Sequence, residues 1–480
     1  MKHFIKLHEN DNVVVIVNDL KAGAEIADGI TLVEDVQAGH KIATKKIEQG
    51  EAILKDNFSI GYASQTIEPG THVHTHNVAS NREGNGELAF QPKVNEKLNL
   101  LMDREIRVYH RKNWEIGIRN ELWILPTVSH VNKTAQLIKE KFLSELKKLE
   151  VDGVHVFEHA HGCFQVGDDL ESTRKILQNI ALHPNTGGVL VLGLGQESNH
   201  IEDFKATLGD YDEERIHFIT ANDHVDEIGA GVESLHQLHE LMRHDYRSTS
   251  LLRKLKIGLK YGDFDAFTAI TAGPLMSALS DYLIRSGGSV VTTELQRMVE
   301  ASHELVGKIE SEEVFQKVVG LAHDFRMPKE YIQKRNGITT LEEKSLGYIK
   351  KMGSTYIVDA LSYGERLKKR GLNLLESPSN ALVSTTALGA AGCQMVLYAT
   401  SLGTPIGSFV PTVKIATNSE LAMRKPNWVD YDAQAAIMTT KEEAVQDFIN
   451  YICDVASGKW VKNEYEGYRE ISIWKRGTTL

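Results

Sequence analysis

"GGVLVLGLG", residues 187–195, is an apolar run with the length of one buried β-strand. Two similar runs precede it, "LWILPTV" at 122–128 and "GVHVFEHA" at 153–160, and "RIHFITA" at 215–221 follows it. The intervening segments "NKTAQLIKEKFLSELKKLE" at 132–150 and "DDLESTRKILQNIALH" at 168–183 have the apolar spacing of amphipathic helices. This alternation predicts a parallel β-sheet covered by helices.

The chain on either side of this segment has a different pattern. Residues 1–78 contain short apolar runs separated by Gly or Pro-Gly turns, which predicts a small β domain. Residues 79–103 are polar, which predicts a linker. We therefore expect an α/β protein with a small N-terminal β domain (1–78), a linker (79–103), a parallel-sheet α/β middle domain (104–247) and a mixed α/β C-terminal domain (248–480).

The composition excludes several classes of protein. Of 480 residues, 41% are hydrophobic and 25% charged, as in ordinary globular proteins. The net charge of −11, with no run of Lys or Arg, argues against a nucleic-acid-binding protein. Three cysteines suit a reducing compartment, and "MKHFIKLHENDN" at the start has no apolar signal segment. We expect a cytoplasmic protein with no membrane partner, and a homo-oligomer, in particular a dimer.

One uncharged stretch, Ser377 to Val413, is long enough to span a bilayer. It also contains many Ser, Thr and Gly residues, so we interpret it as buried core in which backbones approach closely.

Polar residues follow three successive strands of the predicted sheet. In an open α/β sheet, ligands bind beyond the carboxyl ends of the strands, so these residues are candidates for a site. They are Ser129 and His130 after the first strand, Glu158, His159, His161 and Cys163 after the second, and Gly193, Gly195, Gln196 and Glu197 after the third. The glycines do not form a GxGxxG motif, so no dinucleotide cofactor is predicted.

The stretch "THVHTHN", residues 71–77, places histidines at every second position. In an extended strand their imidazoles share one face, and imidazole is a common metal ligand. Two neighbouring histidines can reach one ion, but His72 and His76 would lie about 13 Å apart at roughly 3.3 Å per residue. A polar strand face that happens to carry histidines is the alternative.

Several longer motifs resemble those of the altronate/galactarate dehydratase family. They are "GTHVHTHN" (70–77), "GIRN" (117–120), "HAHGC" (159–163), "HPNTGGVLVLGLG" (183–195), "EEKSLG" (342–347), "ALGAAGCQMVLYATSLGTPIGS" (387–408) and "PTVKIATN" (411–418). The likeness runs from about residue 10 to 440. It implies an N-terminal domain of the SAF type, a small β-clip fold. It also implies a metal-dependent hydro-lyase that converts a sugar acid to a 2-keto-3-deoxy acid, with Fe(II) the first choice of metal and Mn(II) or Mg(II) as alternatives.

The resemblance suggests which residues form the site. For the metal we expect His74 and His76, with Cys163 as a further ligand and His72 as a spare. The N-terminal domain would then act as a lid that carries metal ligands to a site built mostly by the other domains. We expect this pocket where "EHAHGC" and "GLGQE" meet the C-terminal motifs, so that His159 and Lys344 share one site.

The chemistry requires a base near the α-proton and an acid near the departing hydroxyl group. His159, Glu294 and Lys344 are the catalytic candidates, although His159 could instead be a metal ligand or a structural histidine. Substrate-binding candidates are Arg119, Asn120, Asp265 and Lys414, and Lys344 could also hold the substrate carboxylate. Glu294 and Asp265 could equally be helix-start residues, Asn120 could cap a turn, and the cations could form exposed ion pairs.

Four positions depart from the family pattern. His130 and Gln196 stand where Cys is frequent, Gly273 stands where Asn is usual, and Arg297 replaces the second Glu of a Glu-Thr-x-Glu motif. These changes leave two alternatives open. The protein could be a sulfo-lyase or another β-eliminating lyase on a small 2-hydroxy acid, or a non-catalytic protein that binds sugar acids.

Overall fold

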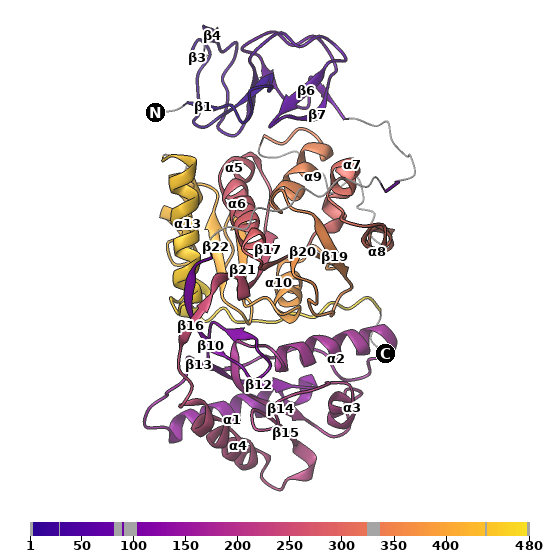
Figure 1. Ribbon diagram of the computed structural model, residues 1–480, viewed down its shortest axis with the longest axis vertical. Coiled ribbons are helices and arrows are strands. Elements are labelled where there is room, and N and C mark those ends of the chain that lie inside the picture. The colour runs from indigo at the N-terminus through magenta and orange to yellow at the C-terminus, as the bar shows by residue number, and fades with distance from the viewer. Residues whose placement is uncertain are drawn as a thin grey trace.

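The computed structural model describes residues 3–27, 29–80, 89–90, 103–323, 337–436 and 439–477. The three expected parts stack along the longest axis of the molecule, with the N-terminal domain at the top of Figure 1, the C-terminal domain in the centre and the middle domain at the bottom. Most of the predicted linker lies outside the described residues, at 81–88 and 91–102.

The N-terminal domain consists of short strands joined by turns. Its sheets have the orders β1-β2-β5-β8, β6-β7-β9 and β3-β4, and its pairs are antiparallel. Buried Val, Ile and Ala side chains fill two small cores. The strands are β1 (Phe4–Ile5), β2 (Val13–Ile16), β3 (Glu25–Ala27), β4 (Ile30–Thr31), β5 (Lys41–Ala43), β6 (Ala52–Lys55), β7 (Phe58–Ala63), β8 (His72–Val73) and β9 (Val78–Ala79).

The prediction that "THVHTHN" is one extended strand is wrong beyond Val73. β8 contains only His72–Val73, and the chain then turns. The backbone amide of His74 donates to Asn77 Oδ1, and the backbone amide of Asn77 donates to the His74 carbonyl, which closes the turn.

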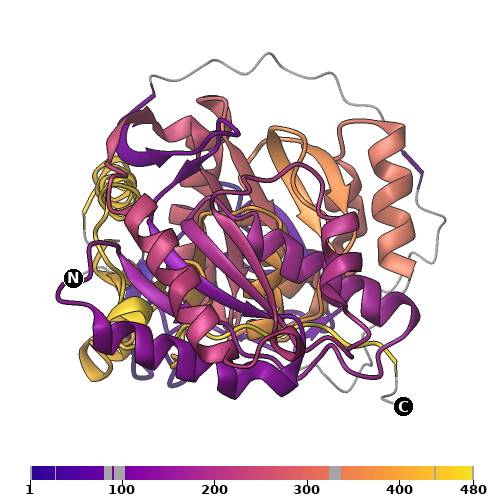
Figure 2. The ribbon, with the colours of Figure 1, turned by 90° about the horizontal axis from the view of Figure 1, so that it is seen from below.

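The middle domain confirms the predicted parallel sheet. Its strands lie in the order β13-β12-β14-β15, all in parallel, and α1 and α4 pack on one face while α2 and α3 pack on the other. Figure 2 shows this sheet between its helices. Every residue of β14 is buried, as its uniformly apolar sequence requires. The elements are β12 (Glu121–Pro126), α1 (Asn132–Glu145), β13 (Gly153–Val156), α2 (Gly167–Ala181), β14 (Thr186–Gly193), α3 (Ile201–Ala206), β15 (Ile216–Thr220) and α4 (Glu227–Met242).

A small antiparallel sheet joins the middle domain to the C-terminal domain. In it, β10 (Glu105–His110) lies between β11 (Ile116–Gly117) and β16 (Ser248–Leu251).

The C-terminal domain contains a second parallel sheet, of seven strands in the order β19-β20-β18-β17-β21-β22-β23. The strands are β17 (Lys256–Tyr261), β18 (Ser289–Thr292), β19 (Ile357–Leu361), β20 (Gly371–Leu375), β21 (Met395–Thr400), β22 (Thr412–Ala416) and β23 (Tyr431–Asp432). The helices are α5 (Ala266–Ile270), α6 (Ala272–Arg285), α7 (Ser302–Val306), α8 (Glu312–His323), α9 (Leu341–Lys350), α10 (Ala381–Ala390), α11 (Ser419–Arg424), α12 (Ala433–Ala436), α13 (Lys441–Ala456) and α14 (Lys462–Tyr465), with the short 3₁₀ helices η4 (Leu295–Arg297) and η5 (Val299–Ala301).

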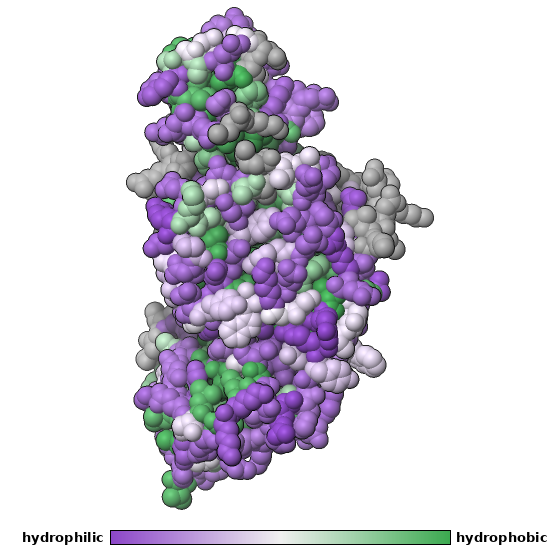
Figure 3. All heavy atoms as spheres, turned by 90° about the vertical axis from the view of Figure 1, so that its left-hand side faces the viewer, coloured by the Kyte–Doolittle hydropathy of each residue, from purple (hydrophilic) through white to green (hydrophobic). Residues whose placement is uncertain are grey.

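The uncharged stretch at 377–413 forms core, as expected. It supplies α10 and β21, whose residues are almost all buried. Among the described residues no helix combines the length and apolar character needed to cross a bilayer. The face in Figure 3 is mostly hydrophilic, with hydrophobic patches in its lower part and at the top.

The two parallel sheets meet near the amino ends of their strands. The side chain of Asn185, just before β14, donates to the Gln394 carbonyl just before β21 (2.9 Å), and Gln394 in turn donates to the Ile116 carbonyl (3.0 Å). The carboxyl ends of the two sheets therefore lie away from this contact.

Candidate active site at the strand ends of the C-terminal domain

A buried carboxylate lies at the carboxyl end of the seven-stranded sheet, where ligands of open α/β sheets bind. Glu294 follows β18 by two residues and adopts left-handed backbone angles (φ 79°). Its two oxygens each lie 2.5 Å from a lysine nitrogen, that of Lys260 in β17 and that of Lys351 just after α9. All three side chains are almost completely buried. This Lys260–Glu294–Lys351 triad links two strands to one helix.

Burial and the ion pairs within the triad shift the pKa of each of its three members. Burial alone would raise the pKa of Glu294, but the two ammonium groups hold it at about 2. Burial lowers the pKa of Lys260, and lowers that of Lys351 to about 8. Charged groups in such surroundings are frequent at functional sites.

Two further cations lie beside the triad. The guanidinium of Arg297, in η4, lies 5.5 Å from the ring centroid of Tyr348, and its Nε donates to Ser379 Oγ (3.2 Å). Partial burial lowers the pKa of Lys344, whose charge interacts with those of Arg297 and Glu294. Because four cations surround one carboxylate, this end of the sheet is suited to an anionic ligand.

Two aspartates follow β17 at the same end of the sheet. Asp263 accepts hydrogen bonds from Thr400 Oγ1 (2.7 Å) and Ser401 N (3.0 Å), at the end of β21. Asp265 caps α5 by accepting from Thr268 N (2.7 Å) and Thr268 Oγ1 (2.8 Å), and burial raises its pKa. Asp265 therefore has the helix-start role that was the alternative interpretation.

The N-terminal domain docks on this site through a buried ionic cluster. Glu343 of α9 accepts from Lys41 in β5 (3.0 Å) and from Lys55 in β6 (2.7 Å), and from Thr339. Although burial raises the pKa of Glu343, the two lysines hold it well below its usual value. A turn at Gly39 (φ 84°) lies against Ala266 of α5, where an added β-carbon would approach the Ala266 β-carbon to 3.4 Å. Figure 1 shows α5 and α9 directly beneath this domain.

Four histidines gather on the docked domain next to this contact. His40 precedes β5, while His72, His74 and His76 come from β8 and the following turn. Ring centroids lie 4.9 Å apart for His40 and His72, 5.1 Å for His40 and His74, and 5.2 Å for His72 and His74. His76 lies 5.7 Å from His72 and is exposed. His72 is thus central to the cluster, and the expected separation of about 13 Å between His72 and His76 is wrong. Which of these imidazoles bind a metal stays a prediction.

The spacing of these rings suits a metal ion, but their nitrogens do not yet converge. Three imidazoles on one tetrahedral ion place their ring centroids about 5 Å apart. Burial lowers the pKa of His72 and of His74 to about 4, so both rings are neutral at pH 7, the form that binds metals. His40 Nδ1 and His72 Nε2, however, share a hydrogen bond (2.8 Å), and no group of three His, Cys, Asp or Glu side chains in the described ranges has metal-site geometry. Rotation of a ring is therefore required before an ion can bind.

Comparisons with known proteins agree with this architecture domain by domain. The family model "Altronate/galactarate dehydratase SAF domain" matches residues 2–81, "D-galactarate dehydratase/Altronate hydrolase, second domain" matches 108–243, and "D-galactarate/Altronate dehydratase, C-terminal" matches 252–479. The chain belongs to the altronate/galactarate dehydratase family.

Its similarity to curated members of the family extends over the whole chain. It is 45% identical to the altronate dehydratase of Escherichia coli K12 (99% of this chain and 100% of the relative) and 42% identical to that of Bacillus subtilis 168 (100% of both). It is 31% identical to the galactarate dehydratase (L-threo-forming) of E. coli K12, over 95% of this chain and 93% of the relative.

The sequence-predicted residues fall into separate places in this family fold. Glu294, Lys344 and Asp265 lie together at the strand ends of the C-terminal domain, and His74 lies on the docked SAF domain. His159 and Cys163 lie in the loop between β13 and α2 of the middle domain, and Figure 1 shows this domain below the seven-stranded sheet and α9 above it. The expectation of one pocket shared by His159 and Lys344 is therefore wrong, and so is the grouping of Cys163 with His74 and His76.

His159 holds the loop after β13 in place. Its Nε2 donates to the Pro126 carbonyl (2.8 Å), and its Nδ1 accepts from His161 N (3.1 Å), so both ring nitrogens are used inside the domain. Burial lowers the pKa of His159 to about 4. These contacts give His159 a structural role, which was one of the alternatives in the sequence analysis.

The three strand ends of the middle domain do converge, as predicted. Ser129 N donates to the His161 carbonyl (2.9 Å), and Glu197 accepts from Thr127 Oγ1 (2.6 Å) and Gly195 N (2.6 Å). The carboxylate of Glu197 is thus hydrogen-bonded to groups at the strand ends, and it stabilises the loop after β14.

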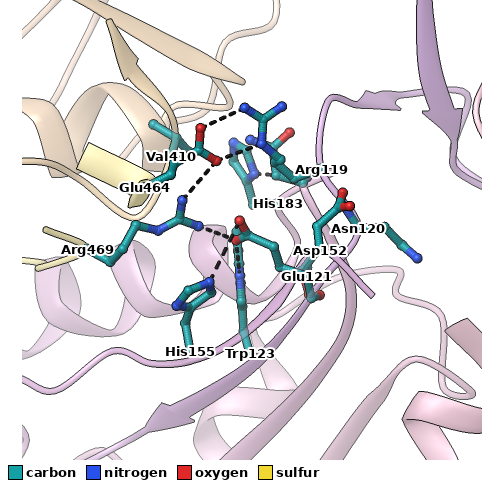
Figure 4. Close-up of polar contacts among 12 residues, drawn as sticks. Arg119, Asn120, Glu121, Trp123, Asp152, His155, His183, Val410, Glu464 and Arg469 are labelled. Atoms are coloured by element: carbon teal, nitrogen blue, oxygen red, sulfur yellow. Dashed lines mark hydrogen bonds and ion pairs between the residues drawn. The ribbon is translucent and has the colours of Figure 1, made fainter. Parts of the chain in front are cut away.

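Arg119 belongs to the contact between the middle and C-terminal domains, whereas the neighbouring Asn120 bonds within the middle domain (Figure 4). Arg119 is completely buried and makes a two-pronged ion pair with Glu464 (2.6 and 2.7 Å), while its other nitrogens reach backbone carbonyls. Asn120 donates to the Met242 carbonyl (3.2 Å). Glu464 also binds Arg469 (3.3 Å). Neither predicted residue has its polar groups free for a substrate.

Lys414 lies within β22, away from the strand end. Its Nζ donates to the Thr404 carbonyl (2.7 Å), and burial lowers its pKa to about 8. The structure therefore places it in the core rather than beside Glu294.

The four departures from the family pattern divide between two regions. His130 and Gln196 are exposed on the middle domain. Gly273 is the second residue of α6 and lies against α5. An added β-carbon there would lie 2.9 Å from the Thr268 carbonyl oxygen, so this position has no room for a side chain. Arg297 alone lies beside the triad.

Sequence reasoning missed His40, Lys260, Lys351 and the role of Arg297. Lys260 carries a usable signal, because a lysine near the end of a buried parallel strand requires a partner. His40 carries none, since only the pairing of β5 with β8 brings it to His72.

Proposed function

We propose that this chain is a hydro-lyase that removes water from a sugar acid, an aldonate such as altronate or an aldarate, and forms a 2-keto-3-deoxy acid. The observation that carries the proposal is the excess of positive charge around Glu294 at the strand ends, which matches an acidic substrate. The names of the full-length relatives support the same class of reaction.

Lys344 is the proposed acid–base residue. Its lowered pKa increases the fraction of neutral amine near pH 7, and it is less buried than Lys260 and Lys351. The amine takes the proton from C2 of the substrate as the C2–C3 double bond forms and the C3–O bond breaks. The same proton neutralises the departing hydroxide, and the enol that remains becomes the 2-keto acid.

Glu294 is a positioning residue in this proposal. Its ion pairs fix Lys260 and Lys351 below the site, and the cationic layer stabilises negative charge that develops on the substrate carboxylate.

A divalent metal ion, Fe(II) as first choice, is part of the proposal. Imidazoles of the SAF cluster, His40, His72 and His74, would hold it, because their type and spacing suit such an ion. When bound, it would supply Lewis-acid stabilisation of negative charge on the substrate. Movement of the SAF domain as a lid stays a prediction.

A substrate panel tests the reaction. Altronate, galactarate, other aldonates and sulfolactate are incubated with the full-length protein and Fe(II), Mn(II) or Mg(II), and keto-deoxy acids are measured. We expect product from at least one sugar acid, and a large loss of kcat in Lys344→Met but none in Lys368→Met, an exposed control. Turnover of sulfolactate alone would establish the sulfo-lyase alternative, and binding without turnover would establish the non-catalytic one.

The cellular setting is a proposal as well. The three cysteines are free thiols, which suits a reducing cytoplasm. The expected dimer stays a prediction that light scattering would test.

A further inference from the structure

Arg297 is a partly buried cation without a carboxylate partner among the described residues. Its Nε donates to Ser379 Oγ (3.2 Å), and its side chain also hydrogen-bonds to Tyr348. A guanidinium has five N–H donors, so others remain available.

Neighbouring residues hold this side chain in one position. Gln296 Nε2 donates to Ser379 Oγ (2.9 Å) and to the Ser377 carbonyl (3.2 Å), which fixes the hydroxyl that Arg297 binds. The backbone carbonyl of Arg297 accepts from Ser345 Oγ (2.7 Å), one residue after Lys344 in α9. Arg297 is thus held both by the loop that follows β20 and by α9.

The nearby acidic groups are already engaged. Both oxygens of Glu294 bind lysines, and Asp263 is bound by Thr400 and Ser401. Lys344 adds a further positive charge beside Arg297 and Glu294. Glu294 stabilises the charged form of Arg297 and raises its pKa, but this single carboxylate already makes ion pairs with two lysines, so the site keeps an excess of positive charge that a bound anion would balance.

We propose that Arg297 is the anchor for the carboxylate of the substrate, a planar anion that matches the fork of a guanidinium. This inference rests on the proposed function and deepens it, since Arg297 then fixes the acid end while Lys344 acts at C2.

Binding measurements test the anchor independently of turnover. Altronate and the neutral polyol altritol are titrated by calorimetry into the full-length, metal-free protein and into Arg297→Met, Arg297→Lys and the exposed control Arg424→Met. For altronate we expect affinity to fall about ten-fold or more in Arg297→Met, to be partly retained in Arg297→Lys, and to be unchanged in Arg424→Met. Altritol should bind equally weakly to all four proteins.

Kinetics give a second readout. In the metal-loaded enzyme, Arg297→Met should raise KM for the sugar acid more than it lowers kcat, with unchanged thermal stability. The inference is overturned if Arg297→Met binds altronate as tightly as the parent, if altronate and altritol lose affinity equally, or if inorganic phosphate is preferred over altronate. Failure of the parent protein to turn over any sugar acid would refute the proposed function, while the calorimetric comparison would still decide the anchor.

Discussion

Glu343 and Lys344 are neighbours in α9, yet their side chains serve different domains. Glu343 is fully buried against Lys41 and Lys55 of the SAF domain, whereas Lys344 interacts with Glu294 and Arg297 of the C-terminal domain. The negative charge of Glu343 also interacts electrostatically with His74 of the SAF domain. The first turn of α9 therefore joins the histidine cluster to the cationic site.

The ionic cluster at this junction predicts an order of stability losses. Lys41→Met leaves Glu343 paired with Lys55, so we expect a loss of about 1–3 kcal/mol in the free energy of unfolding. Glu343→Gln leaves two buried ammonium groups without a carboxylate, so its loss should be larger, about 3–5 kcal/mol. Urea unfolding measures both, with Lys21→Met, an exposed lysine of the same domain, as the control. The charge argument fails if Lys41→Met is the more damaging change.

The triad predicts that one substitution lowers both stability and turnover. Glu294→Gln keeps the shape of the side chain but leaves Lys260 and Lys351 without a counter-charge, so we expect about 3–5 kcal/mol of destabilisation and a large fall in kcat. Denaturant unfolding and steady-state kinetics measure the two effects. Wild-type stability in Glu294→Gln would show that the ion pairs contribute little.

Acid should weaken the protein through Glu294. Its pKa is about 2 in the native protein and returns to about 4.5 on unfolding, so between these values the unfolded chain binds more protons. The stabilisation is complete above pH 4.5 and is lost as the pH falls towards 2. Unfolding free energies measured from pH 6 downward should fall less steeply in Glu294→Gln than in the parent. Identical slopes would contradict the low pKa.

The histidine cluster predicts unequal effects on metal uptake. His72→Ala and His74→Ala should each lose most of the bound metal, because these rings lie at the centre of the cluster. His76→Ala should lose less, since His76 is exposed and contacts only His72 among the four. Elemental analysis after dialysis gives the stoichiometry, and circular dichroism checks the fold. Complete loss in His76→Ala with retention in His72→Ala would restore the arrangement expected from an extended strand.

The sequence by itself determined the layers of the fold. The apolar runs at 122–128 and 187–195, spaced by amphipathic helices, specify a buried parallel sheet, because a strand covered on both faces must be apolar throughout. The same reasoning identified 377–413 as core. It also suggested Glu294 and Lys344 as candidate site residues, through motifs that resemble those of the family.

Only the tertiary structure decided which of these residues meet. Glu294 lies 34 positions from Lys260 and 57 from Lys351, and the order of strands in the sheet brings them together. The sequence suggested that Arg119 binds the substrate, but α14 packs beside it and Glu464 of this helix forms an ion pair with its guanidinium. His159 and Lys344 both follow plausible motifs, yet the two sheets meet at their amino ends, so their carboxyl ends diverge. Local periodicity is a property of short segments, whereas the partners of a buried charge depend on long-range packing that no local pattern encodes.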